Sequence, residues 1–577
     1  MSNIDDEIPV QGRSRVEGRT ITDLHHYRAE IFYVAIDKIC VEMDHRFSEG
    51  SNIILDCFSC LDPKNSFSKF DVDKLARFAD IYHEDFSDDD HGTIRNQLET
   101  YVLQESAKTA ELIVLIMALE LAKDKNFDKL WVEKDLSYDQ MPSILKQCFV
   151  YFSLYPKDHI FNSLAMCELW VALGLVQSRN GREKLEHVAR KYIDELHSRS
   201  FIQDVNDLGF FCQFKVHHLI QDLALYVAGD EFVAVNSQTR HIPQQARHLS
   251  FVVEDKSFDH ALFPESRSVR SIQFPIRGMG LESESVLNTW LSKYKYLRYL
   301  NLSNSSFETV PKSIAKLEHL CFLNISLNQK IRTLPNSICE LLNLQVLSFQ
   351  GCTKLEELPK GLGKLISLRI LCVSTKQSTL PYYEFASLNN LQTLIFKDCV
   401  NLKFLFEHPL PSVEKLHCIS CESLESLPLN TFPKLQTLYI HGCQMLNLSL
   451  ENENSIQKLR MKHLYLIDFP KLLTLPQWIV CAGDTLETFY IIKFPNLQML
   501  PEYLTTMTRL KRIGIISCSQ LLSLPTSGWD HLTVLDDLFI CECPELYQKC
   551  QPHSGEYWPM IRHIKNLHIE EGEKEEE

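Results

Sequence analysis

The chain has 577 residues, of which 45% are hydrophobic, and a net charge of −16, so it is long enough for two or more folded units. Its acidic balance makes nucleic acids and anionic membranes poor partners, because phosphate contacts need Lys and Arg. The longest apolar stretch, near Leu112–Leu119, is shorter than the roughly 20 residues that span a bilayer.

The cysteines and the N-terminus indicate a compartment. There are 19 cysteines, and the polar residues Met1–Gly18 do not form a secretion signal. This combination is typical of free thiols in a reducing environment. We therefore expect a cytoplasmic protein, with the nucleus as a second location.

The N-terminal hundred residues are expected to hold a disordered stretch over 1–19 and helices over 20–104. Apolar residues from Phe32 to Met43 recur at steps of four and three, which is typical of an amphipathic helix. Phe70–Ala79 and Gly92–Gln104 predict further helices. Cys57 and Cys60 form a single Cys-x-x-Cys, a weak zinc signal without a second pair.

Several runs in this segment resemble a late part of plant hAT-type transposase-derived proteins: His25–Arg28, Met43–Phe47, Leu61–Ser68 and Phe70–Ala76. The resemblance implies the helical insertion region of an RNase H-like transposase. No acidic triad for metal-dependent catalysis can be assembled from it, because Asp71 and Asp73 face different directions on a helix. Residues 105–130 match neither this family nor the next one, and we expect them to form a junction helix.

Residues 131–240 show a helical pattern. Leu145, Phe149 and Phe152 recur at helical spacing, and Pro156 is expected to end that helix. Leu169–Leu173 predicts a buried helix that ends near Gly174. An amphipathic helix is expected over Glu183–Ser198.

Three ordered blocks in this region resemble the C-terminal part of the nucleotide-binding (NB-ARC) domain of plant disease-resistance receptors. They are Cys148–Asp158, Cys167–Gly174 and Phe214–Ala224, and the third is similar to the Met-His-Asp region of the winged-helix subdomain. By this resemblance His217 faces the phosphates of ADP, and His218 stands where the family has aspartate. An imidazole cannot supply that carboxylate. The alternative is that His217 and His218 cap the start of a helix.

No cofactor is expected. Intact members of the family bind ADP or ATP, but the sequence has no Gly-x-x-x-x-Gly-Lys-Ser/Thr motif to cradle phosphates. Its Gly-containing run at Pro359–Lys364 lies inside a repeat, where it makes a turn.

Residues 241–569 are predicted to form a leucine-rich-repeat solenoid. The pattern apolar-x-x-apolar-x-apolar starts at Leu297 and recurs at Leu320, Leu344 and Leu368, which are 23 or 24 residues apart. Leu-Pro pairs in phase with the pattern end each strand region. Cysteines fall just after several strands, where a Cys or Asn side chain caps the inner turn: Cys352, Cys399, Cys421, Cys443, Cys518 and Cys543.

Stacked repeats bury a continuous core and line a concave surface with a parallel sheet. The fold class is therefore α/β, a solenoid preceded by a winged-helix bundle and a helical N-terminal segment. An acidic, disordered tail is expected over 570–577. The candidate binding residues point outward from the first concave strands: Arg298, Tyr299, Asn301, Phe322, Asn324, Gln345, Val346 and Ser348.

Such a mixed surface suits protein recognition. We expect a truncated disease-resistance-type receptor, not an enzyme, that binds a pathogen effector or host protein during plant defence. No catalytic or metal-binding residues are expected. The alternatives are a nucleotide-dependent switch of the NB-ARC type and a transposase-derived nucleic-acid-binding protein.

Overall fold

The computed structural model describes residues 7–9, 20–22, 138, 140–177, 183–207, 211–236, 239–252, 268–276, 280–448 and 459–571. The chain divides into two compact units, Met1–Leu136 and Ser137–Glu577.

In the first unit, strands β1 (Glu7–Pro9) and β2 (Thr20–Thr22) pair antiparallel, with Ile8 opposite Ile21. The expectation of disorder over 1–19 is therefore wrong at residues 7–9. It rested on polar composition, whereas the β-branched residues of these short runs favour a strand. The helices expected over 20–104 and the junction helix over 105–130 lie outside the described residues, apart from Thr20–Thr22.

The second unit begins with a winged-helix bundle. Its small antiparallel sheet has the order β3-β5-β4, and its helices pack around a cluster of buried aromatic rings. The elements are α8 (Ser143–Val150), β3 (Phe161–Asn162), α9 (Ser163–Ala172), α10 (Leu185–Ser198), β4 (Gln203–Asp207), β5 (Cys212–Lys215) and α11 (His218–Ala228).

Local sequence explains the limits of α9. The Oδ1 of Asn162 accepts hydrogen bonds from the backbone N–H of Leu164, at 2.9 Å, and of Ala165, at 3.3 Å, which satisfies free donors at the helix start. The helix stops before Gly174, whose φ of 80° suits glycine. The expected buried helix over Leu169–Leu173 and its glycine stop are confirmed.

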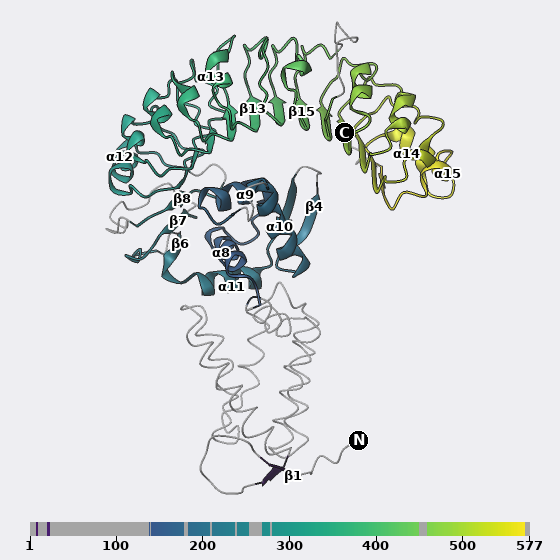
Figure 1. Cartoon of the computed structure of the whole chain (residues 1–577). Coiled ribbons are helices and arrows are strands. Elements are labelled where there is room, and N and C mark those ends of the chain that lie inside the picture. The colour runs from purple at the N-terminus through teal and green to yellow at the C-terminus, as the bar shows by residue number, and fades with distance from the viewer. Residues whose placement is uncertain are drawn as a thin grey trace, which may run out of the picture. The chain divides into compact units, whose positions relative to one another are not determined.

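The larger part of the second unit is a solenoid with a 15-stranded parallel sheet (Figure 1). Strand β6 already belongs to this sheet, so the domain boundary expected at residue 241 lies too late; β6 lacks the leucine pattern on which that boundary rested. The strands are β6 (Phe232–Val235), β7 (His248–Phe251), β8 (Ser271–Gln273), β9 (Tyr299–Asn301), β10 (Phe322–Asn324), β11 (Val346–Ser348), β12 (Ile370–Val373), β13 (Thr393–Lys397), β14 (Lys415–Ile419), β15 (Thr437–His441), β16 (His463–Ile467), β17 (Thr488–Ile492), β18 (Arg512–Ile516), β19 (Asp537–Cys541) and β20 (Asn566–Glu570).

The register of the strands stacks the leucines of successive repeats. Leu300, Leu323, Leu347 and Leu371 are direct neighbours across β9 to β12, and all four are buried. Each repeat thus supplies one layer of a core that only its neighbours can complete. β20 includes Glu570, the first residue of the expected tail, and residues 572–577 lie outside the described part.

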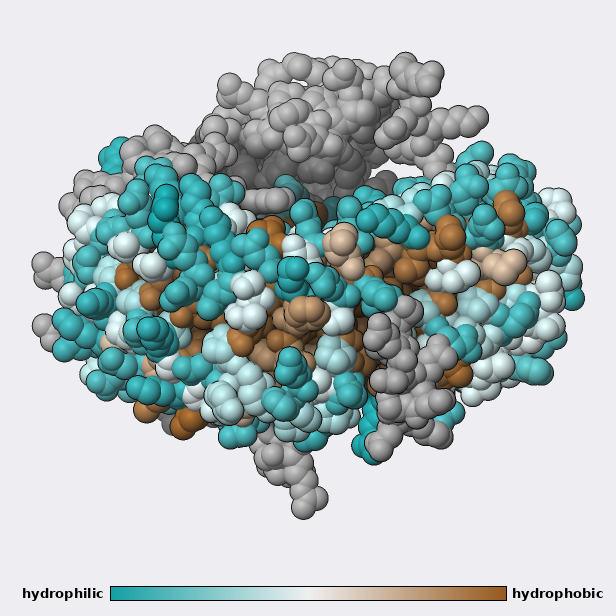
Figure 2. Space-filling model, turned by 90° about the horizontal axis from the view of Figure 1, so that it is seen from above, coloured by the Kyte–Doolittle hydropathy of each residue, from teal (hydrophilic) through white to brown (hydrophobic). Residues whose placement is uncertain are grey.

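Short helices cover the outer side of the arc. Helix α12 (Glu284–Lys293), α13 (Tyr382–Ala386), α14 (Pro544–Cys550) and α15 (Trp558–Ile561) lie there (Figure 1). Seen from above, this side is mainly polar with apolar patches between the polar groups (Figure 2). Within the described ranges, no helix is both long and apolar enough to cross a bilayer.

The expected caps after the strands are confirmed. The thiol of Cys352 donates to the carbonyl of Ile325 at 3.2 Å. At the same position of the preceding repeat, Asn328 donates to the carbonyls of Leu302 at 3.0 Å and Ile325 at 2.7 Å. Backbone carbonyls that have no hydrogen-bond donor on a neighbouring strand thus accept a bond from a buried side chain.

Candidate protein-binding surface

The eight residues expected to bind a partner lie on or directly beside strands β9, β10 and β11. The rings of Tyr299 and Phe322 stack with centroids 4.1 Å apart. Both rings are buried, and so are Val346 and Ser348. The other four, Arg298, Asn301, Asn324 and Gln345, are half-buried.

The winged-helix bundle covers this part of the concave side. In Figure 1, α9, α10 and β4 lie within the hollow of the arc. The Nε of Arg298 donates to the carbonyl of Ala172 at the end of α9, over 3.1 Å, and α9 packs against β10. The first concave strands therefore do not form the open surface that we expected. The repeat pattern places these residues on the concave side but carries no information about which other domain packs there.

Ion pairs join the bundle to the solenoid further along the arc. Arg512 of β18 bonds Asp207 of β4 through Nη2 at 2.9 Å, and bonds Asp537 through Nε at 2.9 Å. Lys184 pairs with Glu414. These contacts hold the bundle over the amino ends of the concave strands.

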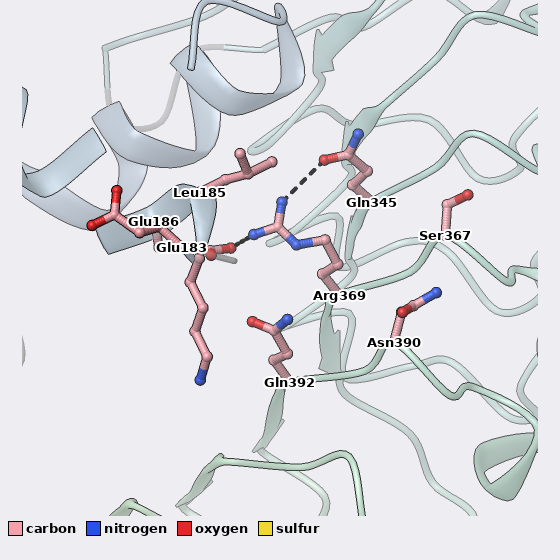
Figure 3. Close-up of a pocket in the computed structure, with 9 residues that line it drawn as sticks. Glu183, Leu185, Glu186, Gln345, Ser367, Arg369, Asn390 and Gln392 are labelled. Carbon is pink, nitrogen blue, oxygen red and sulfur yellow. Dashed lines mark hydrogen bonds and ion pairs between the residues drawn. The ribbon is translucent and has the colours of Figure 1, made fainter. Parts of the chain in front are cut away.

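A polar cavity of about 440 Å³ lies where α10 meets β11 to β13. Arg369 extends into it between Glu186 of α10, with which it forms an ion pair, and Gln345, which accepts from its Nη1 at 3.2 Å (Figure 3). Asn390 and Gln392 line the other side (Figure 3). Because Arg369 pairs with Glu186 across the cavity and Lys184 pairs with Glu414 beside it, the cavity forms part of the contact between bundle and solenoid.

One carboxyl group at this contact has an unusual acidity. Burial raises the pKa of Glu168 on α9 to about 7, although Lys415 and Arg369 lower it. Burial also lowers the pKa of Lys415. The contact therefore contains groups whose charge depends on how the two domains pack.

His217 and His218 start helix α11. The Nδ1 of His217 accepts from the backbone N–H of Leu219 at 3.2 Å, which is the helix-capping alternative of the sequence analysis. The Nε2 of His218 lies 2.7 Å from Oδ1 of Asp158, and this contact lowers the pKa of Asp158. A carboxylate therefore lies beside His218 although it comes from another part of the chain. Whether the two histidines ever sense a nucleotide stays a prediction.

The later repeats carry a row of rings on the concave side, which we call the aromatic row. It consists of residues that are direct neighbours from strand to strand, with Gly514 in the place of a ring on β18. Its ring centroids are 4.5 to 6.0 Å apart. The row is His417, Tyr439, Tyr465, Tyr490, Phe539 and His568.

A second row runs beside it, two positions further along each strand, and we call it the isoleucine row. It consists of Ile419, Ile467, Ile492 and Ile516, with His441 on β15 and Cys541 on β19. Tyr439, Phe539, Ile419, Ile492 and Ile516 are all half-buried, so solvent still reaches them. The two rows form an apolar strip across β14 to β19.

Sequence reasoning missed this strip because it considered outward residues in the first repeats alone. The signal is present in the sequence. Tyr439, Tyr465, Tyr490 and Phe539 each stand between the last two apolar residues of their repeat pattern. In the described part of the chain, no group of three or more His, Cys, Asp or Glu side chains could hold a metal ion.

Comparison with known proteins matches both folded parts of the second unit. Residues 154–224 match the model of the disease resistance protein winged helix domain, and residues 276–483 match that of a leucine-rich repeat region. The chain therefore has a segment similar to the winged helix domain of disease resistance proteins, followed by a leucine-rich repeat region. The winged-helix and leucine-rich-repeat parts of the resemblance given in the sequence analysis are thereby confirmed, while the NB-ARC assignment and the hAT-like segment stay predictions.

The relatives are plant proteins. A putative disease resistance protein of Arabidopsis thaliana is 35% identical over 200 residues, which cover 33% of this chain and 14% of that protein. Disease resistance protein RGA2 of Solanum bulbocastanum is 35% identical over 186 residues, covering 32% and 16%. The matched part of the chain thus spans less than a quarter of the length of these relatives.

Among solved structures, a leucine-rich-repeat protein of Leptospira interrogans is 19% identical, with a TM-score of 0.35 over 60% of this chain and 96% of that chain.

Proposed function

We propose that this chain acts as a protein-recognition component of plant defence and that the later repeats of its solenoid bind the partner. The observation that carries the proposal is the apolar strip formed by the aromatic and isoleucine rows on β14 to β19. Solvent still reaches its half-buried members Ile419, Tyr439, Ile492, Ile516 and Phe539. Aromatic residues with apolar neighbours are enriched where proteins bind one another. The disease resistance relatives support plant defence as the setting.

The partner is a pathogen effector or a host protein, and the site of action is the cytoplasm or the nucleus. We propose no catalytic role for the chain. The nucleotide-free state expected from the sequence also stays a proposal. Its support is that His217 uses its ring nitrogen to cap α11. Equilibrium dialysis with ADP tests it: saturable binding would overturn the proposal.

We further propose that residues 20–104 derive from a hAT-type transposase-like protein. The support is the set of matching runs given in the sequence analysis. Full-length transcript sequencing across residues 104–135 tests whether both parts share one message. Separate transcripts for the two parts would contradict the proposal.

The binding proposal is tested with the tagged full chain expressed in leaf tissue that has been exposed to a pathogen. We expect a protein to co-purify saturably with the unchanged chain and to be lost with Ile516→Asp, which places a charge in the strip. Val534→Asp is the matched control, because Val534 is exposed and lies outside both rows. The proposal fails if every saturable partner is retained equally by Ile516→Asp and Val534→Asp.

A further inference from the structure

We infer that the apolar strip binds an amphipathic helix of the partner, with Lys or Arg residues along one side of its apolar face. This inference rests on the proposed function and specifies the chemistry of the partner. Three features of the strip support the inference: the complete pairing of its strands, its dimensions and the charges along its borders.

The backbone of the strip offers no place for an added strand. Strands β14 to β19 each pair with a neighbour on both sides in the sheet. An extended peptide that binds by adding a strand needs a free sheet edge. The partner must therefore contact side chains, and a helix presents side chains on its whole surface.

The dimensions of the strip suit one face of a helix. From β14 to β19 there are five steps between neighbouring strands, which at about 4.8 Å each give roughly 24 Å. A helix of about 16 residues has that length. The two rows are two residues apart along each strand, or about 7 Å, which is close to the width of the apolar stripe of an amphipathic helix.

The two borders of the strip differ in charge. Directly beyond the isoleucine row, the strand ends carry Asp468 and Glu542 against Lys493. At the amino end of β18 the charges are paired, because Arg512 bonds both Asp207 and Asp537. A partner helix with basic residues over the acidic border would gain favourable charge contacts there, while acidic residues would be repelled.

Two buried rings in the middle of the strip mean that the partner must lie along its surface and not deep within it. Tyr465 and Tyr490 are buried, and their rings stack with centroids 5.4 Å apart. The reachable groups are Ile419 and Tyr439 at one end, Phe539 at the other, and Ile492 and Ile516 between them. A helix along the rows touches all of these, whereas a compact ligand touches one end only.

The test uses a display library of 18-residue peptides selected on the full chain. The spacing of apolar residues and the sign of the flanking charges vary independently in the library. We expect enrichment of peptides with apolar residues at steps of three and four and with Lys or Arg on one side. Each enriched peptide is then titrated by fluorescence anisotropy against the unchanged chain, Ile492→Asp, Glu542→Lys and Val534→Asp.

We expect Ile492→Asp to weaken binding about tenfold or more and Glu542→Lys to weaken it about threefold, with the latter effect fading at high salt. Val534→Asp should stay within about twofold, and circular dichroism of all variants should match. Enrichment of acidic peptides, of proline-rich peptides without helical spacing, or of peptides that bind Ile492→Asp unchanged would overturn the inference. If the tissue partner is lost with Ile516→Asp while the peptides fail in this way, the proposed function stands and only the helix is wrong.

Discussion

The ring of Tyr490 lies against Gly514 on the next strand, so close that a Cβ atom added at Gly514 would fall 2.1 Å from its Cδ1. Gly514 occupies the place of a ring in the aromatic row and leaves the space into which Tyr490 leans. This relationship lets Tyr490 and Phe539 meet with centroids 6.0 Å apart across an intervening strand.

We expect Gly514→Ala to displace the Tyr490 ring and to lower the free energy of unfolding by about 1–3 kcal/mol, the usual effect of overpacking. Urea denaturation followed by circular dichroism measures the change. The control is a double variant: after Tyr490→Ala the space is free, so adding Gly514→Ala should lower stability little further. Equal losses with and without the Tyr490 ring would show that the close approach does not matter.

The contact between α9 and the concave strands should respond to pH through Glu168. Its ordinary pKa of 4.5 is raised to about 7 by burial. Between these values the unfolded chain releases the proton while the folded chain keeps it, so the folded state loses stability as pH rises from 4.5 to 7. We expect Glu168→Gln to raise the melting temperature relative to the unchanged chain at pH 7.5 and to give little difference at pH 4.5.

The control for this pH effect is an exposed glutamate on the solenoid. Glu356→Gln makes the same chemical change at the solenoid surface, where the side chain of Glu356 is 55% exposed. It should shift the melting temperature equally at both pH values. A difference for Glu168→Gln that is also the same at both pH values would contradict the raised pKa.

The side chain of Asn328 should contribute strongly to the stability of the fold. It is fully buried, and its Nδ2 donates to the carbonyls of Leu302, Ile325 and Ser326. Asn328→Ala leaves these acceptors without that donor, which we expect to cost about 2–3 kcal/mol of stability. Asn328→Cys should recover part of the loss, because Cys352 fills this role in the next repeat.

The matched control for this change is Asn343→Ala. Asn343 also donates its Nδ2 to a backbone carbonyl, that of Glu318 at 2.8 Å, but at an exposed position. Water can replace that bond, so its loss should stay within about 0.5 kcal/mol. Equal effects of the two alanine variants in urea denaturation would rule out a special role for the buried caps.

The sequence predicts the solenoid well because its physics is local and repeated. Leu323 and Leu347 must stack on their neighbours whatever else the chain does, and the caps at Asn328 and Cys352 follow from strand ends that need donors. The covered state of Tyr299 and Phe322 could not be predicted in this way. It depends on the bundle packing into the arc through contacts such as Arg298 with Ala172, for which no periodic pattern exists. The aromatic row could be predicted from the sequence, but only by comparing the same position in all the repeats.

The ion pairs of Arg512 decide how firmly β4 is held against β18. Arg512 joins Asp207 of the bundle to Asp537 of the solenoid, and its side chain is 27% exposed. For a partly exposed pair we expect Arg512→Ala to cost about 1 kcal/mol or less. That corresponds to hydrogen exchange at Gln203–Asp207 that is about two- to fivefold faster. Lys462→Ala breaks a pair within the solenoid, with Glu487 at 3.9 Å, and should leave exchange at Gln203–Asp207 unchanged. Unchanged exchange in Arg512→Ala would mean that the other contacts of the bundle, such as Lys184 with Glu414 and Arg298 with Ala172, hold it in the arc without Arg512.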